Sequence, residues 1–106
     1  MNAFTIPEIL ALEDAYQIFQ KVCYTYGKDI QDVLVHNKSR KRDYVEIRQI
    51  SMYLFMNKLG YSYNQAGDCF LKDDATARHA EKTISNLLET DKFIKIKMSK
   101  IISHEL

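Results

Sequence analysis

Apolar residues recur at three- and four-residue steps through most of this chain, which is the spacing of amphipathic helices. The clearest case is residues 62–88. The second half of this stretch carries one stripe of apolar residues, namely Ala77, Ala80, Ile84, Leu87 and Leu88. The first half has a smaller apolar face, formed by Ala66, Cys69 and Phe70. The pattern predicts a short helix, a tight turn and a longer helix.

Residues that cap helices stand at the start of both predicted helices. Ser62 precedes the short helix, and Asp73 and Asp74 precede the long one, where negative charge suits the positive end of the helix. Alanine at positions 77 and 80 leaves room for another helix to cross closely. This is the geometry of a helix-turn-helix, whose second helix offers its first turns to the DNA major groove. An antiparallel helix pair in any small bundle would need the same features.

The flanking segments are also predicted to be helical. Thr5 and Glu8 form a capping box with Pro7 in the first turn, so a helix is expected from there to about Tyr26, with Gly27 as its C′ residue. Its apolar positions are Ile9, Leu12, Tyr16, Phe19, Cys23 and Tyr26. A single turn at 30–34, capped by Asp29, follows it.

Residues 44–59 are apolar around most of the circumference and predict the central helix. A terminal helix should start at a Thr90 or Asp91 cap. Its expected apolar positions are Phe93, Ile94, Met98, Ile101 and Ile102. With one proline and three glycines in 106 residues, we expect a single all-α domain over residues 1–106, of about five or six helices and containing the helix-turn-helix.

The net charge of +1 is unevenly distributed. Residues 1–34 and residues 61–91 each carry −3, whereas residues 35–60 carry +4 and residues 92–106 carry +3. The first positive segment begins with a polar, basic loop at 36–43. Such a run is often only a solvated surface, but here it leads directly into the central helix. Arg48 and Gln49 are expected to emerge in the first turns of that helix, where they can meet phosphates. The lysines of the terminal helix more simply keep that helix soluble.

The central segment resembles a known family. Residues 48–54, RQISMYL, differ by one residue from the RQIAMYL signature of the C-terminal duplex-DNA-binding domain of the bacterial replication initiator DnaA, whose helix-turn-helix relates it to the Trp repressor group. The likeness spans roughly residues 15–105. Downstream it continues through Ser62, Gly67, Phe70, Asp73, Thr76, His79, Ala80 and Ile84.

The resemblance implies a role for each matching position. Arg40 matches the loop arginine that enters the minor groove, and Arg48 and Gln49 match residues that grip phosphates. Together with their basic neighbours they give the expected phosphate and minor-groove set: Lys38, Arg40, Lys41, Arg42, Arg48 and Gln49. The expected candidates for base contacts in the major groove are Asn64, Lys72, Asp73, Asp74, Thr76 and His79.

The chain departs from the family at this recognition surface. The family has a GRDHSTV signature there. In this chain the Gly-Gly-Arg before the aspartate is shortened to Leu71 and Lys72, the histidine is Asp74, and the next residue is Ala75. Because base contacts depend on donors and acceptors of fixed type, we expect a different preferred sequence. Asp74 could accept from cytosine N4, or it could cap the helix, which we favour.

Catalytic and cofactor signals are weak. The three histidines have no local carboxylate or thiol arrangement that would form a nucleophile with its base, no pair of glutamates stands at metal-ligand spacing, and no GxxxxGK[ST] phosphate loop occurs. Cys23 and Cys69 are expected to be buried thiols. We therefore expect a non-enzymatic protein without cofactor, metal or small-molecule substrate. Lacking a long apolar run or a signal pattern, it should not meet membranes and should lie in the cytoplasm, associated with the nucleoid.

The expected function is sequence-preferring binding to double-stranded DNA, in replication control or transcription regulation, with the oligomeric state undetermined. The alternative is a protein-interaction module that keeps the fold without binding DNA. The −3 charge of residues 61–91 motivates that alternative. It would be favoured by exposed tyrosines among Tyr24, Tyr26, Tyr44, Tyr61 and Tyr63.

Overall fold

The computed structural model describes Ile9 and residues 12–103, and this part of the chain contains six helices and no strand. The helices are α1 (Glu13–Thr25), α2 (Ile30–Val35), α3 (Arg42–Lys58), α4 (Tyr63–Asp68), α5 (Asp74–Thr90) and α6 (Lys92–Ser103). The all-α prediction, with a short helix, a turn and a longer helix over residues 62–88, is confirmed.

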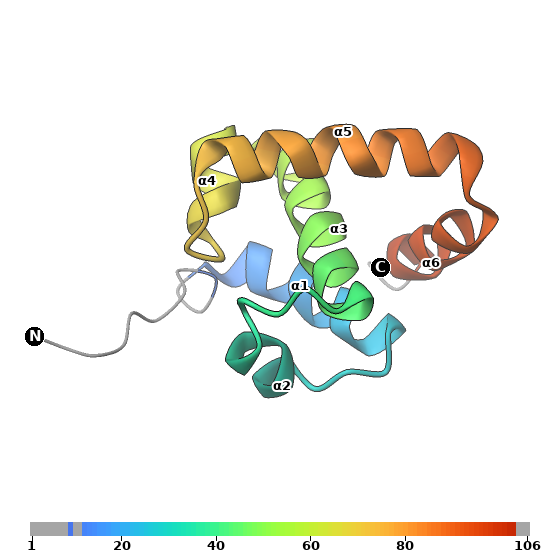
Figure 1. The fold of residues 1–106 in the computed structure, drawn as a ribbon, viewed down its shortest axis with the longest axis horizontal. Coiled ribbons are helices and arrows are strands. Elements are labelled where there is room, and N and C mark those ends of the chain that lie inside the picture. Colours follow the sequence, from blue (N-terminus) through green and yellow to red (C-terminus); the bar gives the residue numbers. More distant parts are fainter. Residues whose placement is uncertain (1–8, 10–11, 104–106) are drawn as a thin grey trace, which may run out of the picture.

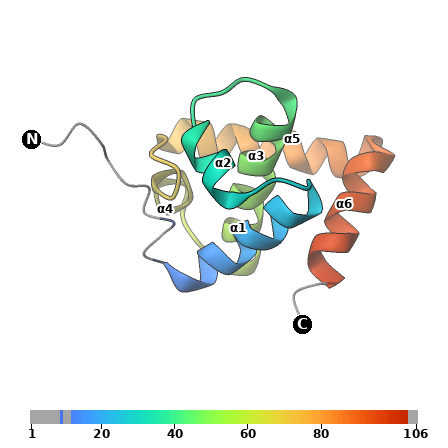
Figure 2. The same cartoon turned by 90° about the horizontal axis from the view of Figure 1, so that it is seen from below.

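The helices are arranged around α3, which contacts α1, α4 and α5. Figure 1 shows α5 along the upper edge of the molecule, α3 running down from it, and α4 and α6 at the two ends of α5. The view from below places α1 and α2 on the side away from α5 (Figure 2). Helix α5 therefore packs against α3, α4 and α6 (Figure 1).

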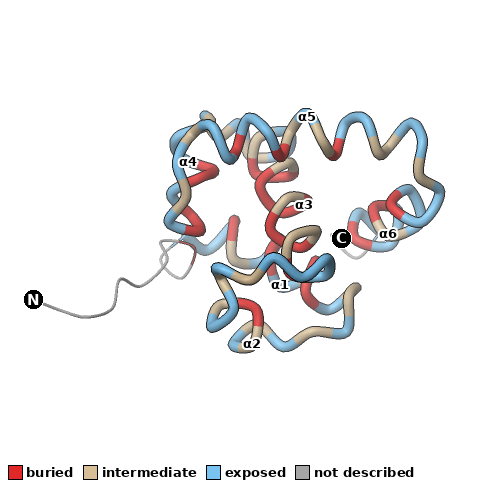
Figure 3. Tube along the Cα trace, in the orientation of Figure 1, coloured by how far each residue is buried: buried red, intermediate tan, exposed pale blue. Residues whose placement is uncertain are grey.

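Three phenylalanines connect the elements at the centre of the core. Phe19 on α1, Phe55 on α3 and Phe70 after α4 are all fully buried. The Phe70 ring lies 5.2 Å from the Phe19 ring and 6.0 Å from the Phe55 ring, measured between centroids. Buried positions line the inner sides of α1, α3 and α5 (Figure 3). The turn of the helix-turn-helix is thus anchored in the core by the Phe70 side chain.

The predicted caps of the helix-turn-helix are present. Ser62 forms a capping box with Gln65, its Oγ accepting from the Gln65 N–H at 3.1 Å and its own N–H donating to Gln65 Oε1 at 2.8 Å. Asp73 caps α5 by accepting from the Thr76 N–H at 2.9 Å. Asp74, favoured from the sequence as a cap, is instead the first residue of α5. Its cap role was therefore wrong, because Asp73 has the extended backbone that a cap requires.

The first helix is shorter than predicted. It begins at Glu13, because Leu12 is in an extended conformation and is 37% exposed rather than part of the apolar face. The Thr5 to Glu8 capping box lies outside the described residues. At the other end the prediction is confirmed: Gly27 has φ +66° and its N–H donates to Tyr24 O, while the Lys28 N–H donates to Cys23 O.

Boundaries elsewhere shift by a few residues. Helix α3 begins at Arg42. Arg42 and Asp43 are therefore helical, whereas they were predicted to lie in the loop. Asp29 precedes α2 as expected but makes no side-chain capping bond. Asp91 caps α6, its Oδ1 accepting from the N–H groups of Phe93 and Ile94 at 2.9 and 3.2 Å.

The predicted apolar stripe of the last helix was partly wrong. Ile94, Met98 and Ile101 are buried, but Phe93 is 70% exposed and Ile102 is 39% exposed. The buried residues are spaced by four and three positions and so occupy one face of the helix. Phe93 is rotated about 100° from Ile94 and lies outside that face.

Candidate nucleic-acid interface

A broad groove separates the basic loop from the first turns of α5. Its volume is about 690 Å³, and its walls come from the loop, from α3 and from the start of α5. It is lined by Lys38, Ser39, Arg40, Val45, Arg48, Gln49, Met52, Lys72, Thr76 and His79. Arg40, Arg48 and Thr76, distant in sequence, thus share one surface, as the resemblance requires.

Arg48 holds the basic loop in place through hydrogen bonds to two backbone carbonyls of the loop. It was expected to emerge from α3, but it is only 8% exposed. Its guanidinium donates through Nη2 to Ser39 O at 2.7 Å and through Nη1 to His36 O at 3.2 Å. Burial lowers the pKa of Arg48. The expectation that the Arg48 side chain emerges was wrong. The loop folds over this side chain, because the carbonyls of the loop need hydrogen-bond donors.

Two further hydrogen bonds join the loop to the turn before α5. Asn37 Nδ2 donates to Phe70 O at 2.8 Å, and Lys72 Nζ donates to Asn37 O at 3.0 Å. Burial, together with the nearby positive charges of Arg48 and Lys38, lowers the pKa of Lys72. The loop is therefore tied both to α3 and to the helix-turn-helix.

Three carboxylates of the helix-turn-helix are engaged within the protein. Asp73 accepts from the N–H and the hydroxyl of Thr76, and these bonds lower the pKa of Asp73. Asp74 pairs with Arg78 at 3.4 Å, and Glu81 accepts from the Tyr63 hydroxyl at 2.7 Å. None of these three carboxylates lines the groove. Although residues 61–91 carry a net charge of −3, none of their carboxylates lines the groove.

The exposed groove side of α5 carries polar groups without negative charge. Thr76 and His79 are exposed and line the groove. The hydroxyl of Thr83, one turn beyond His79, lies 3.4 Å from His79 Nε2. These side chains offer hydrogen-bond donors and acceptors without negative charge, which suits a surface next to phosphates and base edges.

Some of the expected site residues lie outside the groove. These are Lys41, Arg42, Asn64, Asp73 and Asp74. Lys41 and Asn64 are exposed, on the loop and on α4 respectively. Arg42 forms an ion pair with Glu46 at 2.9 Å, and this hydrogen-bonded pairing raises the pKa of Arg42. The groove thus contains Lys38, Arg40, Arg48, Gln49, Lys72, Thr76 and His79 of the expected set.

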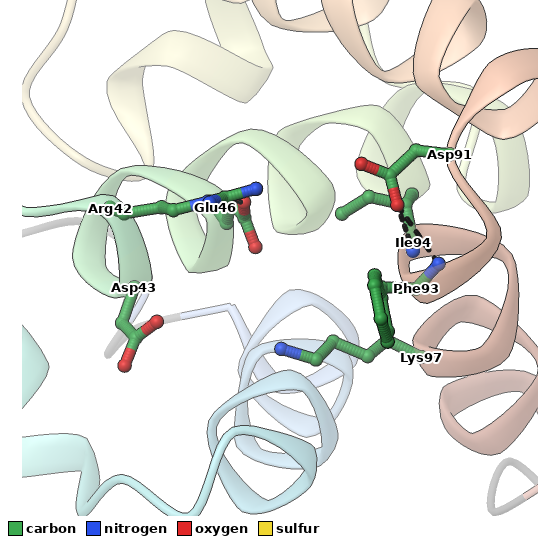
Figure 4. Close-up of a pocket in the computed structure, with 7 residues that line it drawn as sticks. All are labelled: Arg42, Asp43, Glu46, Asp91, Phe93, Ile94 and Lys97. Atoms are coloured by element: carbon green, nitrogen blue, oxygen red, sulfur yellow. Dashed lines mark hydrogen bonds and ion pairs between the residues drawn. The ribbon is translucent and has the colours of Figure 1, made fainter.

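Arg42 lines a second, smaller pocket of about 280 Å³ between the starts of α3 and α6 (Figure 4). Its other lining residues are Asp43, Glu46, Asp91, Phe93, Ile94 and Lys97. Most of the charged groups are already paired: Glu46 also accepts from the Tyr26 hydroxyl at 2.6 Å, and Lys97 lies over the Tyr26 ring at 3.8 Å. Asp43 lies 3.9 Å from Lys28.

Sequence reasoning missed several residues that line the groove or hold its loop in place. Asn37, whose amide fixes the loop, and Ser39, whose carbonyl receives Arg48, were part of the loop but were assigned no role. Val45 and Met52 form an apolar part of the lining. The available signal was periodicity, since positions 45, 48, 49 and 52 follow one side of α3.

The tyrosines named for the protein-interaction alternative are mostly covered. Tyr44 is buried, and Tyr26, Tyr61 and Tyr63 pack partly against the core. Tyr24 is 75% exposed. Exposure of these rings therefore gives the alternative little support.

Within the described residues, no group of three or more histidine, cysteine or acidic side chains could hold a metal ion. Cys23 and Cys69 are buried free thiols, as predicted. No helix in the part of the chain that the structure describes has the length and apolar character to cross a membrane.

The capped short helix, the tight turn and α5, with a basic loop held beside α5, define a helix-turn-helix domain. Comparison with known proteins identifies which one. Residues 15–84 match the family described as bacterial dnaA protein helix-turn-helix, so the chain belongs to that family.

Curated relatives agree with this assignment. The chain is 40% identical over 88 residues to the chromosomal replication initiator protein DnaA of Bacteroides thetaiotaomicron, a match covering 81% of this chain and 18% of that protein. It is 38% identical over 72 residues to the chromosomal replication initiator protein DnaA 2 of Chlamydia caviae, covering 68% of this chain and 15% of the relative. The chain thus spans under a fifth of the length of these two relatives.

Proposed function

We propose that this domain binds double-stranded DNA without covalent chemistry, with the start of α5 in the major groove and the basic loop on phosphates and in the minor groove. The observation that carries the proposal is the shared groove, which brings Lys38 and Arg40 of the loop together with Thr76 and His79 of α5. Family membership supports the same function.

The charge distribution of the site supports this function. Lys38, Arg40 and Lys41 are exposed on the loop, where they can contact phosphates. Arg48 contributes by holding the loop, and Gln49 is half-buried on the groove wall. Cations on the loop and polar hydrogen-bonding groups on α5 match the usual division between contacts that position a protein and contacts that select a sequence.

Fluorescence anisotropy with labelled duplexes at increasing salt tests the proposal directly. If four phosphates are neutralised, log affinity should fall against log salt with a slope of about −3.6. Absence of salt-sensitive binding at micromolar protein and low salt would reject it. That result would favour the protein-interaction alternative, for which Tyr24, Val35 and Phe93 offer exposed apolar surface.

Loop cations should contribute equally on every sequence. Arg40→Ala is expected to weaken binding to all duplexes alike and to reduce the salt slope by about 0.9 for each phosphate that the arginine neutralises. Lys95→Ala is the matched control, because Lys95 is an equally exposed cation on α6, outside the groove. Equal reductions in affinity from both variants would show that Arg40 acts only through net charge.

The preferred DNA sequence should differ from that of relatives that keep the GRDHSTV signature. Asp74 is engaged with Arg78, Ala75 has no polar group, and the turn is shortened at Leu71 and Lys72. Selection from random duplexes would reveal the preferred site. We further propose a role in replication control or transcription regulation, in the cytoplasm at the nucleoid; recovery of a site from a replication origin or a promoter would distinguish the two roles.

A further inference from the structure

Two hydrogen bonds join the basic loop to the turn before the recognition helix α5, and their partners are separated by 33 and 35 positions in sequence. A protein that binds DNA through two separate segments loses affinity if their spacing must be ordered on binding. The way in which this chain fixes that spacing therefore bears on its proposed function.

The first bond attaches the loop to a rigid part of the turn. Asn37 Nδ2 donates to the carbonyl of Phe70, whose ring is fully buried against Phe19 and Phe55. Asn37 Oδ1 is itself buried and has no hydrogen-bond partner. The side chain therefore incurs a desolvation cost at this position while making the bond to Phe70.

The turn that carries these groups is tightly constrained. The Lys72 N–H donates to Gly67 O at 2.9 Å, and Leu71 is held at φ 60°, a left-handed conformation that is unfavourable for a leucine. A Cβ at Gly67 would lie 2.7 Å from the carbonyl oxygens of Lys72 and Asp73. The Phe70 carbonyl and the Lys72 backbone are consequently fixed relative to the start of α5.

The second bond runs in the opposite direction across the same gap. Lys72 Nζ donates to the backbone carbonyl of Asn37 at 3.0 Å. The ammonium is partly buried near the cations Arg48 and Lys38, and this surrounding lowers the pKa of Lys72. A base-contacting lysine would instead be expected to extend into solvent.

We infer that Asn37 and Lys72 form a clamp that fixes the basic loop at a set distance from α5, and that Lys72 is a positioning residue rather than a base-contacting one. The inference rests on the proposed function, since the clamp matters only if loop and helix bind one duplex. It assigns a role to Asn37, which the sequence did not single out.

Hydrogen exchange of the free protein tests the clamp without DNA. Asn37→Ala removes one bond without changing charge, and Lys72→Met removes the other while keeping most of the side-chain length. Both should speed exchange of the Ser39 and Lys41 amides, by about threefold to tenfold for the removal of one hydrogen bond. Amides of α1 should be unchanged, as should all amides in the control Lys95→Met.

DNA binding tests the consequence of the clamp. Both variants should weaken binding by the same factor on preferred and random duplexes. In the Arg40→Ala background the effect of Asn37→Ala should shrink, because the clamp acts through the placement of that arginine. A circular dichroism melt of each variant, showing a cooperative transition, ensures that the comparison concerns folded protein.

The outcomes separate this inference from the proposed function. If wild-type protein fails to bind any duplex, the proposed function fails, whereas unchanged loop exchange in both variants overturns the clamp itself. A reduction in affinity confined to the preferred duplex for Lys72→Met would make Lys72 a base-contacting residue. Strict additivity of Asn37→Ala with Arg40→Ala would show that the clamp does not act through the loop.

Discussion

Arg48 shows how one residue can meet a family pattern with an unexpected geometry. It lies in the RQISMYL segment that resembles a phosphate-contacting motif, yet its guanidinium donates to the carbonyls of His36 and Ser39. Only 8% of its surface is exposed, so it supports the loop from within the protein. Its contribution to DNA binding would therefore be accompanied by a contribution to stability.

Arg48→Met should lower the free energy of unfolding without DNA by about 1 to 3 kcal/mol, because two loop carbonyls lose a charged donor. Urea unfolding monitored by circular dichroism measures this decrease. Arg40→Met is the control, and its exposed side chain predicts a change within about 0.5 kcal/mol. Similar small effects from both variants would contradict the supporting role of Arg48.

Thr76 is the residue for which the groove most directly predicts base recognition. Its hydroxyl donates to Asp73 Oδ1 at 2.8 Å and lies on the exposed side of α5. Thr76→Val keeps the shape and removes the hydroxyl, so affinity should fall about threefold to tenfold on the preferred duplex alone. Anisotropy on preferred and random duplexes measures the difference. Equal decreases on both would assign Thr76 to helix capping only.

At the scale of elements, the turn between α4 and α5 decides where the recognition helix points. The turn is compact because Gly67 lets the backbone oxygens of Lys72 and Asp73 approach closely. Glycine is needed there for space, not for an unusual φ angle, since Gly67 lies within helix α4. The sequence showed a glycine at this position but could not show which atoms approach it.

Gly67→Ala should destabilise the domain by about 1 to 3 kcal/mol, because a Cβ at 2.7 Å from two backbone oxygens forces the turn to move. Thermal melts measure the change. Gly60→Asn serves as the control: Gly60 has φ +72° and open space around it, and asparagine tolerates that conformation. If Gly67→Ala destabilised the domain no more than Gly60→Asn does, the close approach of the two carbonyl oxygens to Gly67 would be contradicted.

The buried faces of α5 and α6 illustrate the limit of periodicity at this scale. Of the predicted stripe of α5, Ala77, Ala80 and Ile84 are fully buried, whereas Leu87 and Leu88 are half-buried and pack against the core. The stripe of the last helix included Phe93, which is exposed, because several registers of apolar residues were possible there. Only packing against the neighbouring helices selected the face with Ile94, Met98 and Ile101.

At the scale of the whole molecule, the core fixes groups whose ionisation is linked to folding. Burial, with a smaller contribution from Asp29, raises the pKa of Cys23 from 9.0 to about 12. Burial and the hydrogen bond to Glu46 also raise the pKa of Tyr26 above its ordinary value. Both groups therefore bind a proton more tightly in the folded state than in the unfolded chain.

Stability should consequently fall as the pH rises above 9, where the unfolded Cys23 thiol ionises and the folded one stays protonated up to about 12. One such group changes the free energy of unfolding by at most about 1.4 kcal/mol per pH unit. Urea unfolding across this range measures the slope. Cys23→Ser should make it shallower, and an unchanged slope would show that Cys23 does not contribute.

The sequence by itself determined the helical class, the capped helix-turn-helix and the basic character of the loop, because periodicity, caps and charge are local properties of consecutive residues. The tertiary structure decided which side chains share the groove. It buried Arg48 against the loop and joined Asn37 to Phe70. These outcomes depend on the crossing of α3, α5 and the loop. Arg48 bonds carbonyls 9 and 12 positions away and Asn37 bonds one 33 positions away, and such contacts leave no periodic signal in the chain.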